Sequence, residues 1–196
     1  MNYLAHAYLS FNRPDVLVGN MISDFVKGKK KYDYAPDILS GIDLHRAIDD
    51  FTDMHPVTKS ARQIFQPVYG LYSGAFMDIA YDYFIANDKQ LFEPGSLDTF
   101  CQEVYDTLDN YTSIFPPRFS QLFPSMKKYN WLLNYRSNTG IQRSFEGLVY
   151  RAVYMSDSEP AFKLFLLNKE KLQDAYKMFF PELIRFTQTA IINNGL

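Results

Sequence analysis

Apolar residues recur at helical spacing along nearly the whole chain of 196 residues, and the alternating runs typical of strands are hard to find. The pattern predicts an all-α fold, organised as a single-domain helical bundle over residues 1–196. Proline and glycine mark most of the predicted helix ends. The expected helices are 3–10, 14–26, 36–55, 56–65, 73–86, 97–115, 117–127, 139–155 and 160–193, with Pro181 as the place for a kink in the last.

The segment 73–86 is apolar on nearly every side, yet it holds Asp78 and Asp82. A helix without a polar face is typically buried at the centre of a fold. Residues four positions apart lie on one face of a helix, where two carboxylates repel each other unless a cation lies between them. The segment therefore predicts a central helix that carries two acidic groups inward.

The apolar stripe of the segment 36–55 continues into titratable residues. At about 100° per residue, Ile38, Ile42, His45 and Asp49 all fall within roughly 60° of one another. A helix that buries these isoleucines carries His45 and Asp49 toward the same interior, where an unpaired carboxylate costs several kcal/mol. A compensating partner is therefore required.

Further polar groups lie on apolar faces, with His6 in the segment 3–10 and Asp24 beyond Asn20 in the segment 14–26. A satisfied core histidine, an aspartate paired with Arg46, or a helix N-cap would explain any single one. Together, two histidines and four aspartates on four apolar helices match the ligands of a hard divalent cation, which favours Mn²⁺, Mg²⁺ or Fe²⁺ over structural zinc. The predicted metal ligands are His6, Asp24, His45, Asp49, Asp78 and Asp82.

Charge, hydropathy and cysteine content limit the kinds of protein that this chain could be. The net charge of −2 gives no general argument for nucleic acid, and no segment approaches the roughly 20 apolar residues of a membrane helix. The single cysteine, Cys101, makes neither an internal disulfide nor a cysteine-based metal site, so we expect a small packed side chain and a reducing cytoplasm.

Basic residues concentrate directly after Asp24. The run contains Lys27, Lys29, Lys30 and Lys31. Such a run is either a solvated loop or a docking patch for an acidic partner or a phosphate.

Three polar residues flank the predicted metal ligands of the segment 36–55. Asp53 and His55 lie where this helix ends, so we expect them nearer solvent than Asp49. His55 would help to start the next helix or donate a proton, and Asp53 would pair with a basic neighbour or bind substrate. Arg46 suits a phosphate, although a salt bridge is an equal alternative.

Several blocks of sequence resemble a known family. The blocks MNYLAHAYLS, GNMISDFVKGK, GIDLHRAIDDFTDMHP and YDYF, spaced over about the first 90 residues, resemble the acyl carrier protein phosphodiesterase family, also called holo-ACP hydrolase. The similarity continues through PPRF, NWLLNY and FFPELI, so it covers most of the chain. The positions that match the family's motifs are His6, Asp24, His45, Arg46, Asp49, Asp53, His55, Asp78 and Asp82.

This resemblance implies an all-helical fold distantly similar to the HD-domain phosphohydrolases. It also implies Mn²⁺-dependent cleavage of the phosphodiester that joins 4'-phosphopantetheine to a serine of holo-acyl carrier protein. Asp24, Arg46 and His55 would take part in catalysis, and the lysine run would guide the acidic carrier protein to the site.

One position departs from the family's pattern. Where members usually read Asp-His-Phe, this chain reads Asp82-Tyr83-Phe84, and Tyr83 is predicted to bind phosphate in place of the histidine. Two other functions stay open. The chain would be an HD-like hydrolase of a nucleotide or another small phosphate ester, or a relative that binds metal or carrier protein without turnover.

Overall fold

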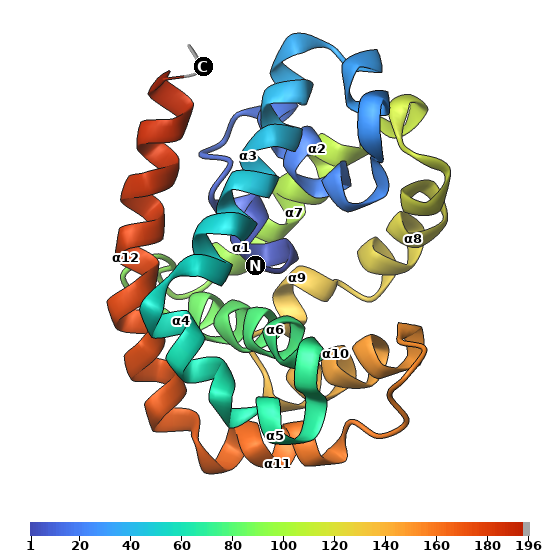
Figure 1. The fold of residues 1–196 in the computed structure, drawn as a ribbon. Coiled ribbons are helices and arrows are strands. Elements are labelled where there is room, and N and C mark those ends of the chain that lie inside the picture. The colour runs from blue at the N-terminus through green and yellow to red at the C-terminus, as the bar shows by residue number, and fades with distance from the viewer. Residues whose placement is uncertain (194–196) are drawn as a thin grey trace.

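The computed structural model describes residues 1–193, which form helices and connecting segments without any strand, so the all-α prediction is confirmed (Figure 1). The finer expectation of an HD-like bundle stays a prediction. The α-helices are α1 Tyr3–Tyr8, α2 Pro14–Ile22, α3 Pro36–Met54, α4 Pro56–Ala61, α5 Gln66–Tyr69, α6 Ser73–Ala86, α7 Ser96–Asp109, α8 Pro117–Lys128, α9 Trp131–Asn134, α10 Asn138–Arg151, α11 Glu159–Leu167 and α12 Lys169–Asn193. The 3₁₀ helices are η1 Ser23–Phe25, η2 Gly28–Asp33, η3 Arg62–Ile64, η4 Gly70–Tyr72 and η5 Thr112–Ile114.

The predicted helix 160–193 is wrong in one respect, because the chain forms two helices there. α11 ends before Asn168, whose backbone and side-chain N–H groups both donate to the carbonyl of Leu164. Asparagine supplies this local hydrogen bonding readily, which favours a helix end over a helix interior. Pro181 lies inside α12, and the short helices α5 and α9 were not predicted. The α-helices predicted over 14–26, 56–65, 97–115 and 139–155 end earlier, at Ile22, Ala61, Asp109 and Arg151.

Two glycines allow α2 and α3 to touch through their backbones. A Cβ atom on Gly19 would lie 2.0 Å from the carbonyl oxygen of Ile38, and one on Gly41 would lie 2.3 Å from that of Val16. Any larger residue would push the helices apart. This contact brings Asn20 of α2 beside His45 of α3, one turn beyond Gly41.

Helix α6 lies at the centre of the molecule, with α1, α10 and α12 packed around it (Figure 1). Phe76, Met77, Ala80, Tyr81 and Asp82 are wholly buried, as its apolar sequence predicts. The long helix α12 runs beside α3, α4 and α6.

Two expectations from composition are also tested by the structure. Cys101 is buried and unbonded, as expected for a packed side chain. Within residues 1–193, every helix is too short or too polar to cross a bilayer.

Candidate metal centre

Two histidines from different helices stack face to face beside one carboxylate. The rings of His6 in α1 and His45 in α3 have centroids 3.8 Å apart and planes within 13° of parallel. The Nε2 atom of His6 lies 3.3 Å from Oδ1 of Asp49, and that of His45 lies 3.2 Å from Oδ2. The three residues offer ligand atoms within 4.8 Å of one another, which is close enough to share one ion.

The backbone of α2 fixes the orientation of His45. Its Nδ1 atom lies 2.8 Å from the carbonyl oxygen of Asn20, and because a carbonyl only accepts, Nδ1 must donate. The Nε2 atom then faces Asp24 and Asp49. A carbonyl that holds the far nitrogen of a histidine in this way is the usual support of a metal-binding imidazole.

The buried imidazole of His6 has no hydrogen-bond partner for either nitrogen among the described residues, since its approach to Asp49 does not have hydrogen-bond geometry. Leaving a buried polar atom unpaired costs about 1–3 kcal/mol. A cation between His6, His45 and Asp49 would give one of the two nitrogens of His6 a partner and so remove part of this cost. The donor set, two imidazoles and a carboxylate, therefore fits a divalent metal ion.

Two further aspartates lie at the edge of the group. Asp24, at the end of α2 in η1, has a side chain 66% exposed, and its Oδ1 atom lies 3.2 Å from Nε2 of His45. Asp78 of α6 is linked to Asp49 by the amino group of Met1. This amino group lies 3.2 Å from Oδ1 of Asp78 and 2.9 Å from Oδ1 of Asp49. Asp24 is therefore the acidic group at the solvent side, and Asp78 lies at the inner side.

The titratable side chains of this centre change one another's pKa values. Burial and the neighbouring His45 lower the pKa of His6 to about 4. Burial also opposes the charge of His45, but hydrogen bonds to Asp24 and Asp49 raise its pKa to about 9. Burial alone would raise the pKa of Asp49, whereas the Met1 ammonium and the two histidines lower it well below its usual range. In the absence of a metal, protonated His45 and the Met1 ammonium therefore lie beside ionised Asp49.

Asp82 has a structural role that its position on the helical wheel did not indicate. Its two carboxylate oxygens accept the backbone N–H groups of Leu4 and Ala5, at 2.8 and 3.1 Å. These N–H groups begin α1, so Asp82 caps that helix from a distant part of the chain. Burial raises the pKa of Asp82 to about 7. The structure supports Asp82 as the anchor of α1 and of His6, not as a principal ligand.

His55 and Asp53 point to other partners. The Nε2 atom of His55 lies 3.2 Å from Oε2 of Glu182, and its ring packs against Phe179 at a centroid distance of 5.0 Å. Asp53 is exposed, with Oδ1 at 3.9 Å from Nη1 of Arg62. The structure therefore ties His55 to α12, which gives no support for a proton donor at this position.

Tyr83 lies on the side of α6 that faces α11 and α12. Its hydroxyl accepts from Lys169, and its ring packs edge-on against Phe165. Neighbouring Asp82 faces α1 instead. The residue that departs from the family's pattern is therefore directed away from the stacked histidines, and its predicted contact with phosphate gains no support.

Basic residues border the exposed side of the centre. Arg46 follows His45, and its Nη2 atom donates to the carbonyl of Val26, at 3.1 Å, two residues beyond Asp24. Lys27, Lys29 and Lys30 are exposed, whereas the Nζ atom of Lys31 is held 2.7 Å from Oδ1 of Asp43. The lysine run is thus largely free for a partner.

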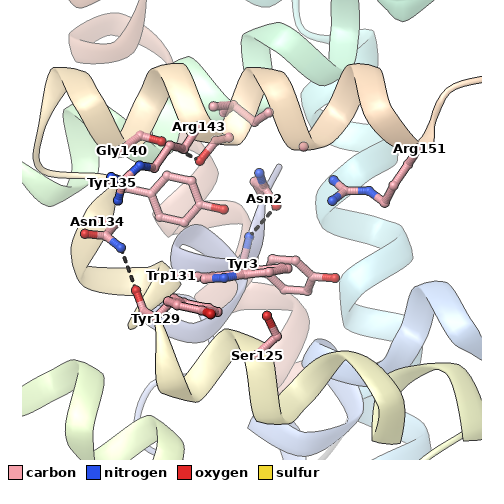
Figure 2. Close-up of a pocket in the computed structure, with 13 residues that line it drawn as sticks. Asn2, Tyr3, Ser125, Tyr129, Trp131, Asn134, Tyr135, Gly140, Arg143 and Arg151 are labelled. Atoms are coloured by element: carbon pink, nitrogen blue, oxygen red, sulfur yellow. Dashed lines mark hydrogen bonds between the residues drawn. The ribbon is translucent and has the colours of Figure 1, made fainter.

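A pocket that the residue pattern did not predict lies between α1, α8, α9 and α10 (Figure 2). Its volume is about 470 Å³. We call it the aromatic pocket, and the lining residues on which we rely are Tyr3, Trp131, Tyr135, Arg143, Gly147 and Arg151. The only sequence signal was the block NWLLNY, whose residues 130–135 include Trp131 and Tyr135.

Comparisons with known proteins agree over nearly the whole chain. The model of the acyl carrier protein phosphodiesterase family matches residues 1–183. The chain is 30% identical to an acyl carrier protein phosphodiesterase from Yersinia pestis over 96% of this chain and 98% of that protein. It is 28% identical to one from Serratia proteamaculans, over 94% and 96%. No solved structure matches the chain significantly.

Proposed function

The chain belongs to the acyl carrier protein phosphodiesterase family and is a phosphodiesterase, and from this membership we propose its substrate and its site. The substrate is holo-acyl carrier protein. Water adds to phosphorus, the bond from phosphorus to the serine oxygen breaks, and that oxygen takes a proton. The products are apo-acyl carrier protein and 4'-phosphopantetheine.

A divalent cation, Mn²⁺ by the resemblance, would be held by His6, His45 and Asp49. The observation that carries this proposal is the buried, unpartnered imidazole of His6, stacked on His45 beside the same carboxylate. When bound, such an ion neutralises phosphate oxygens and makes water more acidic. Asp24 is the fourth ligand at the solvent side, where substrate would arrive.

The residues around this centre would hold the substrate. Arg46 is kept beside the segment of Asp24 by its bond to Val26, and its remaining donors suit the non-bridging oxygens of a phosphodiester. The exposed lysines Lys27, Lys29 and Lys30 would attract the acidic surface of the carrier protein. Asp78, next to Met1 and Asp49, would keep Asp49 in place from the inner side.

Mass spectrometry of holo-acyl carrier protein tests this proposal. Incubation with the protein and Mn²⁺ should remove the mass of the prosthetic group, and excess chelator should prevent this. Asp24→Ala should lose the activity, whereas Asp50→Ala, which changes an exposed residue of the same charge, should keep it.

A small chromogenic phosphodiester, assayed in parallel, separates the alternative. If the protein cleaves the small ester but leaves holo-acyl carrier protein intact with every metal tried, the carrier-protein substrate is wrong and the small-ester hydrolase is favoured. If it cleaves neither, the proposed activity is wrong.

A further inference from the structure

The aromatic pocket shares a wall with the metal centre. The amino group of Met1 contacts Asp49 and Asp78, and the next two residues of the chain, Asn2 and Tyr3, line the pocket. On α6, Ile79 lines it directly after Asp78. A molecule that fills the pocket would therefore lie beside the residues proposed to hold the ion.

The walls of the pocket are suited to an uncharged chain with some polar atoms. Tyr3 and Trp131 form an aromatic pair with centroids 6.4 Å apart, and buried Tyr135 adds a third ring. Asn2 and Asn134 add side-chain amides. A volume of about 470 Å³ lies in the usual range for small-molecule sites, which are mostly apolar with a few polar groups.

Two arginines give the pocket a positive charge. Arg143 and Arg151 lie eight residues apart on α10, so they are separated by about 12 Å along the helix axis. Both are exposed, and among residues 1–193 neither forms an ion pair. Figure 2 shows the guanidinium of Arg151 directed from α10 toward the pocket.

Arg151 lies on the same side of the pocket as the hydroxyl of Tyr3 (Figure 2). Burial raises the pKa of Tyr3, and the charges of Asp24 and Arg151 act on it in opposite directions, so both lie within electrostatic reach of its hydroxyl. The guanidinium also lies over Gly147, where a Cβ atom would be 3.4 Å from Nη1. A phosphate held beside the hydroxyl of Tyr3 would thus lie within electrostatic reach of an unpaired guanidinium.

We propose that the aromatic pocket binds the pantetheine arm of the substrate, with Arg151 on its phosphate. This inference rests on the proposed function. The arm is an extended chain with two amides and a pair of methyl groups, ending in a thiol. The aromatic rings would pack on its methyl groups and amide planes, and the arm would run along α10 from Arg151 toward Arg143.

Trp131 makes the test specific to this site, because it is the chain's single tryptophan. Its fluorescence should change saturably with pantetheine, and at lower concentration with 4'-phosphopantetheine. Inorganic phosphate at the same concentrations should leave it unchanged. Arg151→Gln should weaken the binding of 4'-phosphopantetheine on the order of tenfold or more and leave that of pantetheine unaltered.

Gly147→Leu places a side chain in the pocket. It causes no backbone clash, because a Cβ atom at this position meets only the end of the Arg151 side chain. Leucine also favours a helix more than glycine does. We expect a retained unfolding temperature, loss of the fluorescence response and a raised KM for holo-acyl carrier protein. Gln142→Leu, on an exposed face of α10 outside the pocket, is the matched control and should behave as the unaltered protein.

Either of two results overturns the pocket assignment. One is no response of Trp131 to 4'-phosphopantetheine. The other is a folded Gly147→Leu protein that binds 4'-phosphopantetheine and processes holo-acyl carrier protein with an unaltered KM. Failure of the proposed function would look different from both results. It would appear as intact holo-acyl carrier protein after incubation with the unaltered protein, regardless of the fluorescence titration of Trp131.

Discussion

His6 and His45 stack with their ring centroids 3.8 Å apart, and the Nε2 atom of each ring lies within 3.3 Å of a carboxylate oxygen of Asp49. Two protonated imidazoles would repel at this distance. The pKa of His6 is accordingly lowered to about 4, with burial as the main cause, while that of His45 is raised to about 9. A metal ion must displace the proton of His45, so its binding will release protons and strengthen with rising pH.

Asp49 should be the most sensitive ligand, because both histidines face it. Asp49→Asn keeps the size of the side chain but removes its charge. We expect Mn²⁺ affinity and turnover each to fall on the order of 100-fold or more. Titration calorimetry and the mass-spectrometric assay measure the two effects. The neighbouring exposed residue provides the control, since Asp50→Asn should change neither, and equal losses in both variants would show that the effect is only one of net charge.

Asp82 should matter for stability more than for metal binding. Asp82→Ala would leave the buried N–H groups of Leu4 and Ala5 without an acceptor, which should lower the free energy of unfolding by about 2–5 kcal/mol. Asp82→Asn retains one acceptor and should cost less. Urea denaturation measures both changes. A folded Asp82→Asn protein of unaltered stability that no longer binds Mn²⁺ would instead identify Asp82 as a ligand.

The metal-free protein should lose stability as pH rises through the range of His45. A histidine with a folded-state pKa raised from 6.5 to about 9 stabilises the fold fully below pH 6.5, and this contribution disappears as pH approaches 9. The difference in unfolding free energy between the unaltered protein and His45→Gln, measured in chelator, should therefore shrink from pH 6.5 to 9. A difference that stays constant over this interval would contradict the ion pairs assigned to His45.

The lysine run should act through long-range charge. Lys29 and Lys30 are exposed and follow the segment of Asp24, so replacing both by Glu should raise KM for holo-acyl carrier protein, with less effect on kcat. The difference should diminish as salt rises. Lys163→Glu with Lys171→Glu makes the same change of charge on α11 and α12. If both double variants behave alike, only net charge matters and the docking role is wrong.

The sequence predicted the helices and the inward direction of His45 and Asp49 because both depend on local periodicity. The stripe that starts at Ile38 and Ile42 is buried, and it continues into His45, which stacks on His6 of α1. Periodicity also correctly indicated that α6 is central. Each of these properties belongs to a single helix, so the spacing of apolar residues along the sequence is enough to predict it.

Contacts between helices were harder to predict. The wheel placed Asp82 on the inner face of α6 but could not show that the first turn of α1 would use both of its oxygens. The sequence also could not show that the Nε2 atom of His55 lies 3.2 Å from Glu182 of α12, which is remote in sequence. The aromatic pocket likewise joins residues of α1, α8, α9 and α10, and no spacing rule connects them.

A crystal of the protein grown with Mn²⁺, with diffraction recorded at an energy where manganese scatters anomalously, would locate the proposed ion. We expect an anomalous peak between the Nε2 atoms of His6 and His45 and the carboxylate of Asp49, with Asp24 on its solvent side. An ordered peak elsewhere, at Asp82 or between His55 and Glu182, with none between the two stacked rings, would contradict this expectation.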